Sequence, residues 1–167
     1  KLNGWINYTY SRTFLRQNDN RIARPINNGD WYPTEYDKPH DFKFVGNYKF
    51  TRRYSLSLNM DYSTGRPTTV PAGQYYNLKL GTTQVFYTDR NSYRVPDYFR
   101  MDLSFNVEAS HHLTLDTHSS ISFGLYNLTG RKNVYSIYYV VEKKKMQGYK
   151  MSIFGAPIPF VTYNIKF

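Results

Sequence analysis

The sequence predicts an all-β protein, and within that class about six C-terminal strands of a transmembrane antiparallel β-barrel. Three observations predict this fold. Apolar and polar residues alternate with a period of two, long connections alternate with short ones, and the last segment keeps its alternation up to a terminal aromatic residue. Because membrane barrels need about eight strands or more to close, we expect a fragment of a larger polypeptide, or several chains that share one barrel.

The two strongest predicted strands are residues 54–64 and 98–108. In the first, Tyr54, Leu56, Leu58, Met60 and Tyr62 alternate with serine, asparagine and aspartate. The second segment alternates phenylalanine, methionine, leucine and valine with polar residues in the same way. A helix would distribute these apolar residues around its circumference, whereas a strand places them all on one face.

Four weaker segments complete the predicted set. They are residues 2–13, 40–50, 119–139 and 150–167. Trp5 interrupts the polar face of the first segment. We expect the third segment to continue as one strand through Tyr135, Ile137 and Tyr139. The pattern contains no helical segment and no second domain.

The connections differ in length in a regular order. If Phe167 ends a strand at the periplasmic side, residues 51–53 and 109–118 are periplasmic turns. Residues 14–40, 65–96 and 142–149 are then extracellular loops. Long outer loops and short periplasmic turns are typical of outer-membrane barrels, so all five connections agree with that class.

Aromatic residues bracket the aliphatic ones on the predicted apolar faces, as Tyr54 and Tyr62 do on one strand and Phe42 and Phe50 on another. Membrane barrels carry aromatic girdles because an amphipathic ring favours the boundary between hydrocarbon and water. The eight steps from Tyr54 to Tyr62, each of roughly 3.3 Å and tilted by ~40°, rise by about 20 Å, close to the ~25 Å apolar band of such barrels. The pattern therefore favours a face that contacts lipid.

The last residues carry a further signal. Val161, Tyr163, Ile165 and Phe167 alternate with polar residues up to the end of the sequence. This arrangement resembles the insertion signal that the outer-membrane barrel-insertion machinery reads. We therefore expect these four residues to form that signal.

Composition leaves two other classes of function open. The chain has 22 Lys and Arg against 12 Asp and Glu, and 19% of its residues are aromatic. A soluble nucleic-acid-binding β-domain would share this composition, but it would place its basic residues on one sheet face rather than largely in loops. The other alternative is an outer-membrane hydrolase barrel, which would need an acid/His or Ser/His site at its rim. The chain has no cysteine and therefore no Cys-based metal site.

Four segments resemble TonB-dependent outer-membrane receptors of the Bacteroidetes, most clearly from about residue 54 onward. In chain order they are residues 63–71 (STGRPTTVP), 87–102 (YTDRNSYRVPDYFRMD), 126–135 (YNLTGRKNVY), and 154–159 (FGAPIP) with 161–167 (VTYNIKF).

The resemblance implies a barrel of about 22 strands with an N-terminal plug, neither of which this chain completes. It implies import of a scarce nutrient such as a siderophore, vitamin, glycan or peptide. Outer loops would capture the ligand, and TonB would displace the plug. The implied partners are the rest of the receptor, TonB, outer-membrane lipids with lipopolysaccharide, the insertion machinery and, as a further candidate, a surface lipoprotein. No nucleic acid, cofactor or enzymatic activity is expected.

The candidate ligand-binding residues lie in the two longest predicted outer loops. Aromatic and arginine side chains there can stack on a ligand or pair with its charge. The candidates are Trp31, Tyr32, Tyr75, Tyr76, Tyr87, Arg90, Tyr93 and Arg94.

Two constellations resemble catalytic or metal sites, but each has a simpler explanation. Asp61 and Asp102 would lie on adjacent strands, where contacts with a plug or water explain them without further assumptions. His111, His112 and His118 have enough donors for zinc, but they lie in or beside a predicted turn exposed to solvent. We therefore predict neither a catalytic residue nor a metal ligand.

Overall fold

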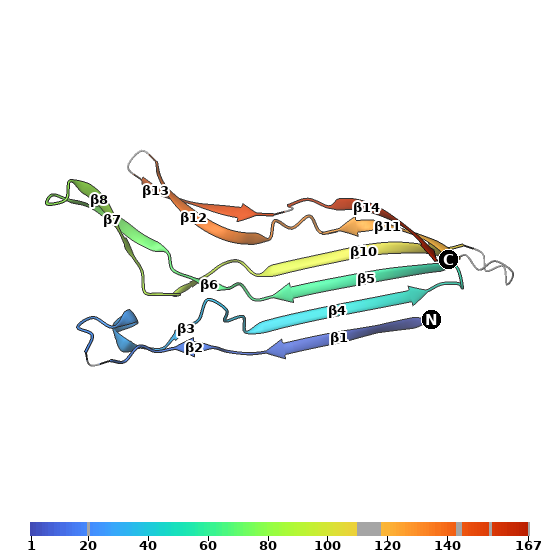
Figure 1. Cartoon of the computed structure of the whole chain (residues 1–167), viewed down its shortest axis with the longest axis horizontal. Helices are drawn as coiled ribbons and strands as arrows, with labels where there is room; N and C mark the ends of the chain where they lie inside the picture. Colours follow the sequence, from blue (N-terminus) through green and yellow to red (C-terminus); the bar gives the residue numbers. More distant parts are fainter. Residues whose placement is uncertain (20, 110–117, 143–144, 154, 167) are drawn as a thin grey trace.

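The chain folds around one large antiparallel sheet, as a computed structural model shows (Figure 1). The structure describes residues 1–167 except 20, 110–117, 143–144, 154 and 167, and the described chain is all-β apart from one short 3₁₀ turn. Six strands form the sheet, in the order β1 (Leu2–Tyr10), β4 (His40–Lys49), β5 (Tyr54–Ser63), β10 (Tyr98–Glu108), β11 (His118–Tyr126) and β14 (Ile158–Lys166).

The register of the sheet confirms the predicted alternation. Directly paired residues continue an apolar row from edge to edge on one face, through Leu2, Tyr48, Leu56, Phe105, Phe123 and Val161. On the other face, Lys43 pairs with Asp61, and Asp61 pairs with Arg100. The sheet therefore has one apolar face and one largely polar face, as period-two alternation requires.

The apolar face of the sheet has no cover within the described chain. Leu2 is 75% exposed and Val161 is 76% exposed, at opposite edges of the same row. Tyr32 and Val95 are the buried hydrophobic residues of the described chain, and both lie outside the six strands. Among the described residues, the sheet is therefore not folded onto a hydrophobic core.

All the long connections leave the same end of the sheet (Figure 1). The short connection between β4 and β5, residues 50–53, lies at the opposite end. The long connections contain four additional pairs of strands and the 3₁₀ turn η1 (Ile26–Gly29). The pairs are β2 (Phe14–Leu15) with β3 (Tyr32–Pro33), β6 (Pro67–Thr68) with β9 (Tyr93–Arg94), β7 (Pro71–Asn77) with β8 (Thr82–Tyr87), and β12 (Val134–Glu142) with β13 (Lys145–Ser152).

The predicted single strand over residues 119–139 is two strands in the structure. β11 ends at Tyr126 because Asn127 and Gly130 adopt positive φ angles of 53° and 62°, which turn the chain away from the sheet. The chain then enters β12, which pairs with β13 in a separate hairpin. Asparagine and glycine are the residues that tolerate this backbone conformation, so the local sequence permits the break.

Two further predicted boundaries also differ from the structure. The predicted strand over residues 150–167 is divided between β13 and β14, with Pro157 immediately before β14. Most of the predicted loop over residues 142–149 therefore belongs to the β12–β13 hairpin. Residues 65–96, predicted as a loop, contain the strand pairs β6–β9 and β7–β8. Pro71 is the first residue of β7, a position where a strand tolerates proline.

The sheet is open, because β1 and β14 are its two edges and do not pair with each other. Each edge strand has nine residues, so each presents a row of unpaired backbone groups. In the described residues, no helix is long and apolar enough to cross a membrane.

Strands β10 and β11 approach closely at Gly124. A Cβ atom at this position would lie 2.1 Å from the Leu103 carbonyl oxygen and 2.8 Å from the Ser104 Cα. We therefore expect Gly124→Ala to push the two strands apart and to lower the free energy of unfolding by about 1–3 kcal/mol. Urea unfolding followed by tryptophan fluorescence measures the change. Ser122→Ala, on the same face of β11, is the control, and an equal loss there would contradict this explanation.

Candidate functional site

Asp37 is the polar centre of the long connections. It is 1% exposed, and its carboxylate accepts a hydrogen bond of 2.8 Å from the Thr13 backbone N–H. Arg94 forms an ion pair with the same carboxylate, and Arg12 Nε lies 3.6 Å from it. Burial would raise the pKa of Asp37, but the bond from Thr13 and the two guanidinium groups outweigh burial and hold the pKa below its usual value.

Arg94 joins two of the long connections. Besides the Asp37 carboxylate, its guanidinium donates to the Asp37 carbonyl at 2.8 Å and to the Gly65 carbonyl at 2.9 Å. Arg94 therefore ties residues 11–39 to residues 64–97 through two acceptors of Asp37, and its bond to Gly65 joins the two ends of its own connection.

Two asparagines reinforce the same junction. Asn27 and Arg90 exchange two hydrogen bonds, of 2.7 and 3.0 Å, between the Asn27 side chain and the Arg90 backbone. The Asn91 side chain donates to the Pro33 carbonyl at 2.8 Å, and its backbone N–H donates to Thr69 Oγ1 at 3.0 Å. Side-chain amides thus supply the pairing that these irregular segments lack in their backbones.

The third long connection, residues 127–157, is fastened to the start of β10. The Asn133 side chain accepts from the Phe99 N–H at 3.0 Å and donates to the Phe99 carbonyl at 2.9 Å. The Arg131 guanidinium donates to the Asp97 carbonyl at 2.8 Å, and Arg66 donates to the Tyr135 carbonyl at 3.3 Å. All three long connections therefore meet at one end of the sheet.

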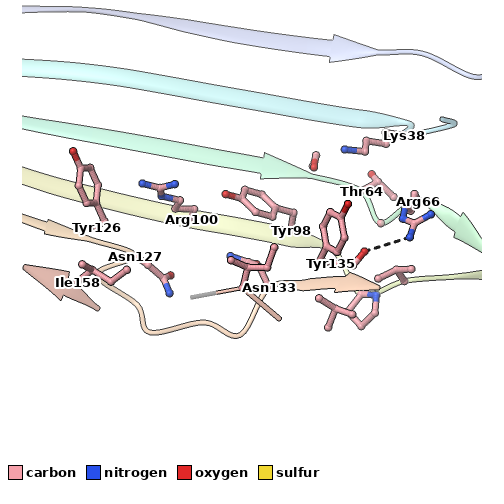
Figure 2. Close-up of a pocket in the computed structure, with 16 residues that line it drawn as sticks. Lys38, Thr64, Arg66, Tyr98, Arg100, Tyr126, Asn127, Asn133, Tyr135 and Ile158 are labelled. Carbon is pink, nitrogen blue, oxygen red and sulfur yellow. Dashed lines mark hydrogen bonds between the residues drawn. The ribbon is translucent and has the colours of Figure 1, made fainter. Parts of the chain in front are cut away.

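A pocket of about 680 Å³ lies where these connections meet. We call it the rim pocket, and Figure 2 shows the residues that line it. Its volume is in the range of about 300–1,000 Å³ that is usual for small-molecule sites. It is lined by Lys38, Ser63, Thr64, Gly65, Arg66, Val95, Pro96, Tyr98, Arg100, Tyr126, Asn127, Asn133, Val134, Tyr135, Ile153 and Ile158.

Strands of the sheet supply the inner end of the rim pocket. Arg100 and Tyr126 extend from the polar face of β10 and β11, and the Arg100 guanidinium lies 5.2 Å from the centre of the Tyr126 ring. Asp102 holds the same guanidinium at 2.8 Å. Phe160 stacks on Tyr126 at a ring distance of 4.3 Å. This end of the pocket is therefore held by side-chain contacts within the sheet.

The predicted ligand-binding residues lie elsewhere, since none of them lines the rim pocket. Tyr87 and Arg90 line a separate, open depression of about 490 Å³ together with Glu35. Tyr32 is buried among the loops, and Arg94 makes the structural contacts described above. The side chains of Trp31, Tyr75, Tyr76 and Tyr93 are exposed.

The other predicted sites have the following positions. Val161, Tyr163 and Ile165 are exposed on the apolar face, and Phe167 lies outside the described residues. Asp61 and Asp102 do lie on adjacent strands, but Asp102 is held by Arg100 and by the Asn127 N–H at 2.8 Å.

The histidine-rich turn is largely outside the described chain. His111 and His112 are not among the described residues, and His118 is the first residue of β11. The described residues contain no group of three His, Cys, Asp or Glu side chains placed to hold a metal ion.

Sequence reasoning missed most of the rim pocket, although a signal for part of it was present. Tyr98 and Tyr126 occupy positions of the polar face, where the neighbouring positions carry serine, aspartate and asparagine. Aromatic residues that interrupt a polar face near a strand end are a usable indication of a site. Lys38, Arg66 and Tyr135 come from irregular segments or a separate hairpin, and only the folded structure brings them together.

Comparisons of the chain with models of protein families, with characterised proteins and with solved structures found no match.

The Asp37 ion pair generates a stability prediction. We expect Asp37→Ala to lower the free energy of unfolding by about 2–4 kcal/mol, because it leaves a partly buried guanidinium without its carboxylate. The matched control is Glu35→Ala, which breaks the exposed ion pair of 3.8 Å between Arg90 and Glu35 and should lower it by less than about 1 kcal/mol. Urea unfolding curves measure both changes, and equal losses would contradict the central place of Asp37.

A second prediction concerns pH. Because the pKa of Asp37 is lower in the folded chain than its usual value, its contribution to stability is complete above about pH 4 and is lost as the pH falls through the folded-state value. The amide introduced by Asp37→Asn carries no charge at any pH. The difference in unfolding free energy between the wild type and this variant should therefore shrink as the pH falls below about 4. A difference that stays constant with pH would argue against this linkage.

Proposed function

We propose that this chain forms part of the wall of an outer-membrane β-barrel receptor that imports a nutrient. The observation that carries the proposal is the uncovered apolar face, which crosses all six strands of the sheet. Soluble proteins cover such a face with a second layer of structure. In a bilayer, hydrocarbon covers it instead, and the strands alternate between lipid and lumen.

The aromatic residues of this face support the same placement. Tyr8, Phe42, Tyr62 and Phe99 form one row across four strands near the long connections. Toward the other end, rings pack across β4, β5, β10 and β11, with ring-centre distances of 4.9–6.5 Å between contacting members. This second group contains Tyr48, Phe50, Tyr54, Phe105 and Phe123. Between these two aromatic bands lie Ile6, Met60, Met101, Leu58 and Leu103, with one further ring, Phe44. This arrangement is similar to the girdles of membrane barrels.

The open edges support a larger barrel. Unpaired N–H and C=O groups along β1 and β14 would be costly in lipid, so further strands must continue the sheet on both sides. We propose that these strands come from the rest of the same receptor, or from further chains that share the barrel. The long connections would then face the cell exterior, where membrane barrels carry their longer loops.

The four segments that resemble TonB-dependent receptors extend the proposal to a mechanism. On that resemblance, the long connections capture a ligand outside the cell, and TonB displaces a plug from the lumen. The proposed partners are the remaining strands and plug, TonB, outer-membrane lipids with lipopolysaccharide, the insertion machinery and a surface lipoprotein. On this proposal the wall itself performs no chemistry, and the protein is a transporter rather than an enzyme.

The polar face speaks against the nucleic-acid-binding alternative. Lys43 lies 4.0 Å from Asp41, and Arg100 lies 2.8 Å from Asp102. Acidic groups thus accompany the basic ones, whereas a surface that tracks a phosphate backbone needs a positive groove.

A labelling experiment tests the lipid-facing placement. The chain has no natural cysteine, so a thiol-reactive label attaches at the introduced cysteine alone. Leu58→Cys lies on the apolar face of β5, and Ser57→Cys is its matched control on the polar face. Each variant is labelled with an environment-sensitive fluorophore and reconstituted in phospholipid vesicles. We expect lipid-borne quenchers to quench the Leu58→Cys label, and water-soluble quenchers to reach the Ser57→Cys label more readily. Equal accessibility of both labels to water would exclude the membrane placement.

A further inference from the structure

The rim pocket carries positive charge that the described chain does not balance. Three of its lining residues, Lys38, Arg66 and Arg100, are basic, and none is acidic. Asp102 neutralises Arg100. Within the part of the chain that the structure describes, no carboxylate lies within ion-pair distance of Lys38 or Arg66. Two cations therefore face the pocket without a counter-charge from the described residues.

Aromatic rings accompany these cations. Figure 2 shows Tyr98 and Tyr135 between Arg100 and Arg66 along the pocket. Tyr135 is 63% exposed, so its ring has free surface for a ligand. The Arg66 guanidinium donates a hydrogen bond of 3.3 Å to the Tyr135 carbonyl. This bond keeps the positive charge of Arg66 beside the Tyr135 residue. A charged subsite and a ring subsite are thus adjacent.

At the opposite end of the pocket, the lining side chains already contact other side chains of the sheet. Tyr126 has Phe160 stacked against it and the Arg100 guanidinium over its ring. Asp102 fixes that guanidinium in turn. This end therefore serves as a rigid wall, and the groups available to a ligand are at the Lys38 and Arg66 end.

We propose that the rim pocket binds a ring-bearing organic carboxylate. Its carboxylate lies between Lys38 and Arg66, where charge-assisted hydrogen bonds form, and its ring packs against Tyr98 and Tyr135. A volume of about 680 Å³ accommodates a molecule of roughly 20 non-hydrogen atoms. This inference rests on the proposed function, because the carboxylate would be the nutrient that the receptor imports. The ligand would be recognised on the lumen side of the place where the long connections meet.

A matched pair of probes tests the proposal. 4-Nitrophenyl β-D-glucuronide and 4-nitrophenyl β-D-glucoside share two rings and differ in one carboxylate. We expect calorimetric titration of the detergent-solubilised protein at low salt to show roughly tenfold or tighter binding of the glucuronide. Ionic strength of about 0.5 M should weaken the glucuronide more than the glucoside, because salt screens the two cations.

Three variants assign the discrimination to the rim pocket. Lys38→Gln with Arg66→Gln should abolish the preference for the glucuronide. Lys38→Gln alone should reduce this preference. This single variant should fold normally, because no described hydrogen bond or ion pair involves the Lys38 side chain, so its reduced preference reports on binding. Lys79→Gln, in the turn between β7 and β8, is the control and should leave the preference unchanged, because Lys79 does not line the rim pocket.

Equal binding of the two probes by the wild type, or no binding of either, would overturn the proposal. Persistence of the preference in the double variant would overturn it as well. Its failure is distinguishable from failure of the receptor proposal, because the cysteine labels report the lipid placement without any ligand. A lipid-shielded label at Leu58→Cys with no preference for the glucuronide rejects the ligand class alone.

Discussion

The antiparallel backbone ladder is the constraint on which the rest of the structure depends. Since successive side chains point to opposite faces, one register across six strands separates the residues into an apolar and a polar face. A slip of one residue would exchange the faces of a whole strand. The rows from Leu2 to Val161 and from Lys43 to Arg100 exist only because all the pairings agree.

The absence of a hydrophobic core in the described chain changes what stabilises it. Backbone pairing holds the sheet, and buried polar contacts hold the loops, with Asp37 as their centre. Such contacts are directional, so they position irregular segments more sharply than apolar packing does. They also explain why Arg94, which resembles a ligand-binding residue in the sequence, is engaged with Asp37 and Gly65.

The same contacts create the rim pocket. Asn133 and Arg131 bring the third connection onto β10, and this places Tyr135 opposite the polar face that carries Tyr98 and Arg100. The pocket therefore combines a rigid sheet wall with a wall of loops. This arrangement suits the proposed receptor function, because the residues of the loops can change to suit a ligand while the strands that position them stay the same.

The sequence alone determined which residues of the large sheet share a face, because alternation is local, and Leu58 and Ser57 of β5 lie on opposite faces as alternation requires. It carried local signals for the break at Asn127 and Gly130, but the choice between bending and continuing β11 depends on where β12 finds a partner. Only the tertiary structure decided the site. Lys38, Arg66 and Tyr135 are far apart in the chain. The hydrogen bond from Arg66 to the Tyr135 carbonyl and the ion pair of Arg94 with Asp37, next to Lys38, bring their segments together, and no periodicity specifies these partners.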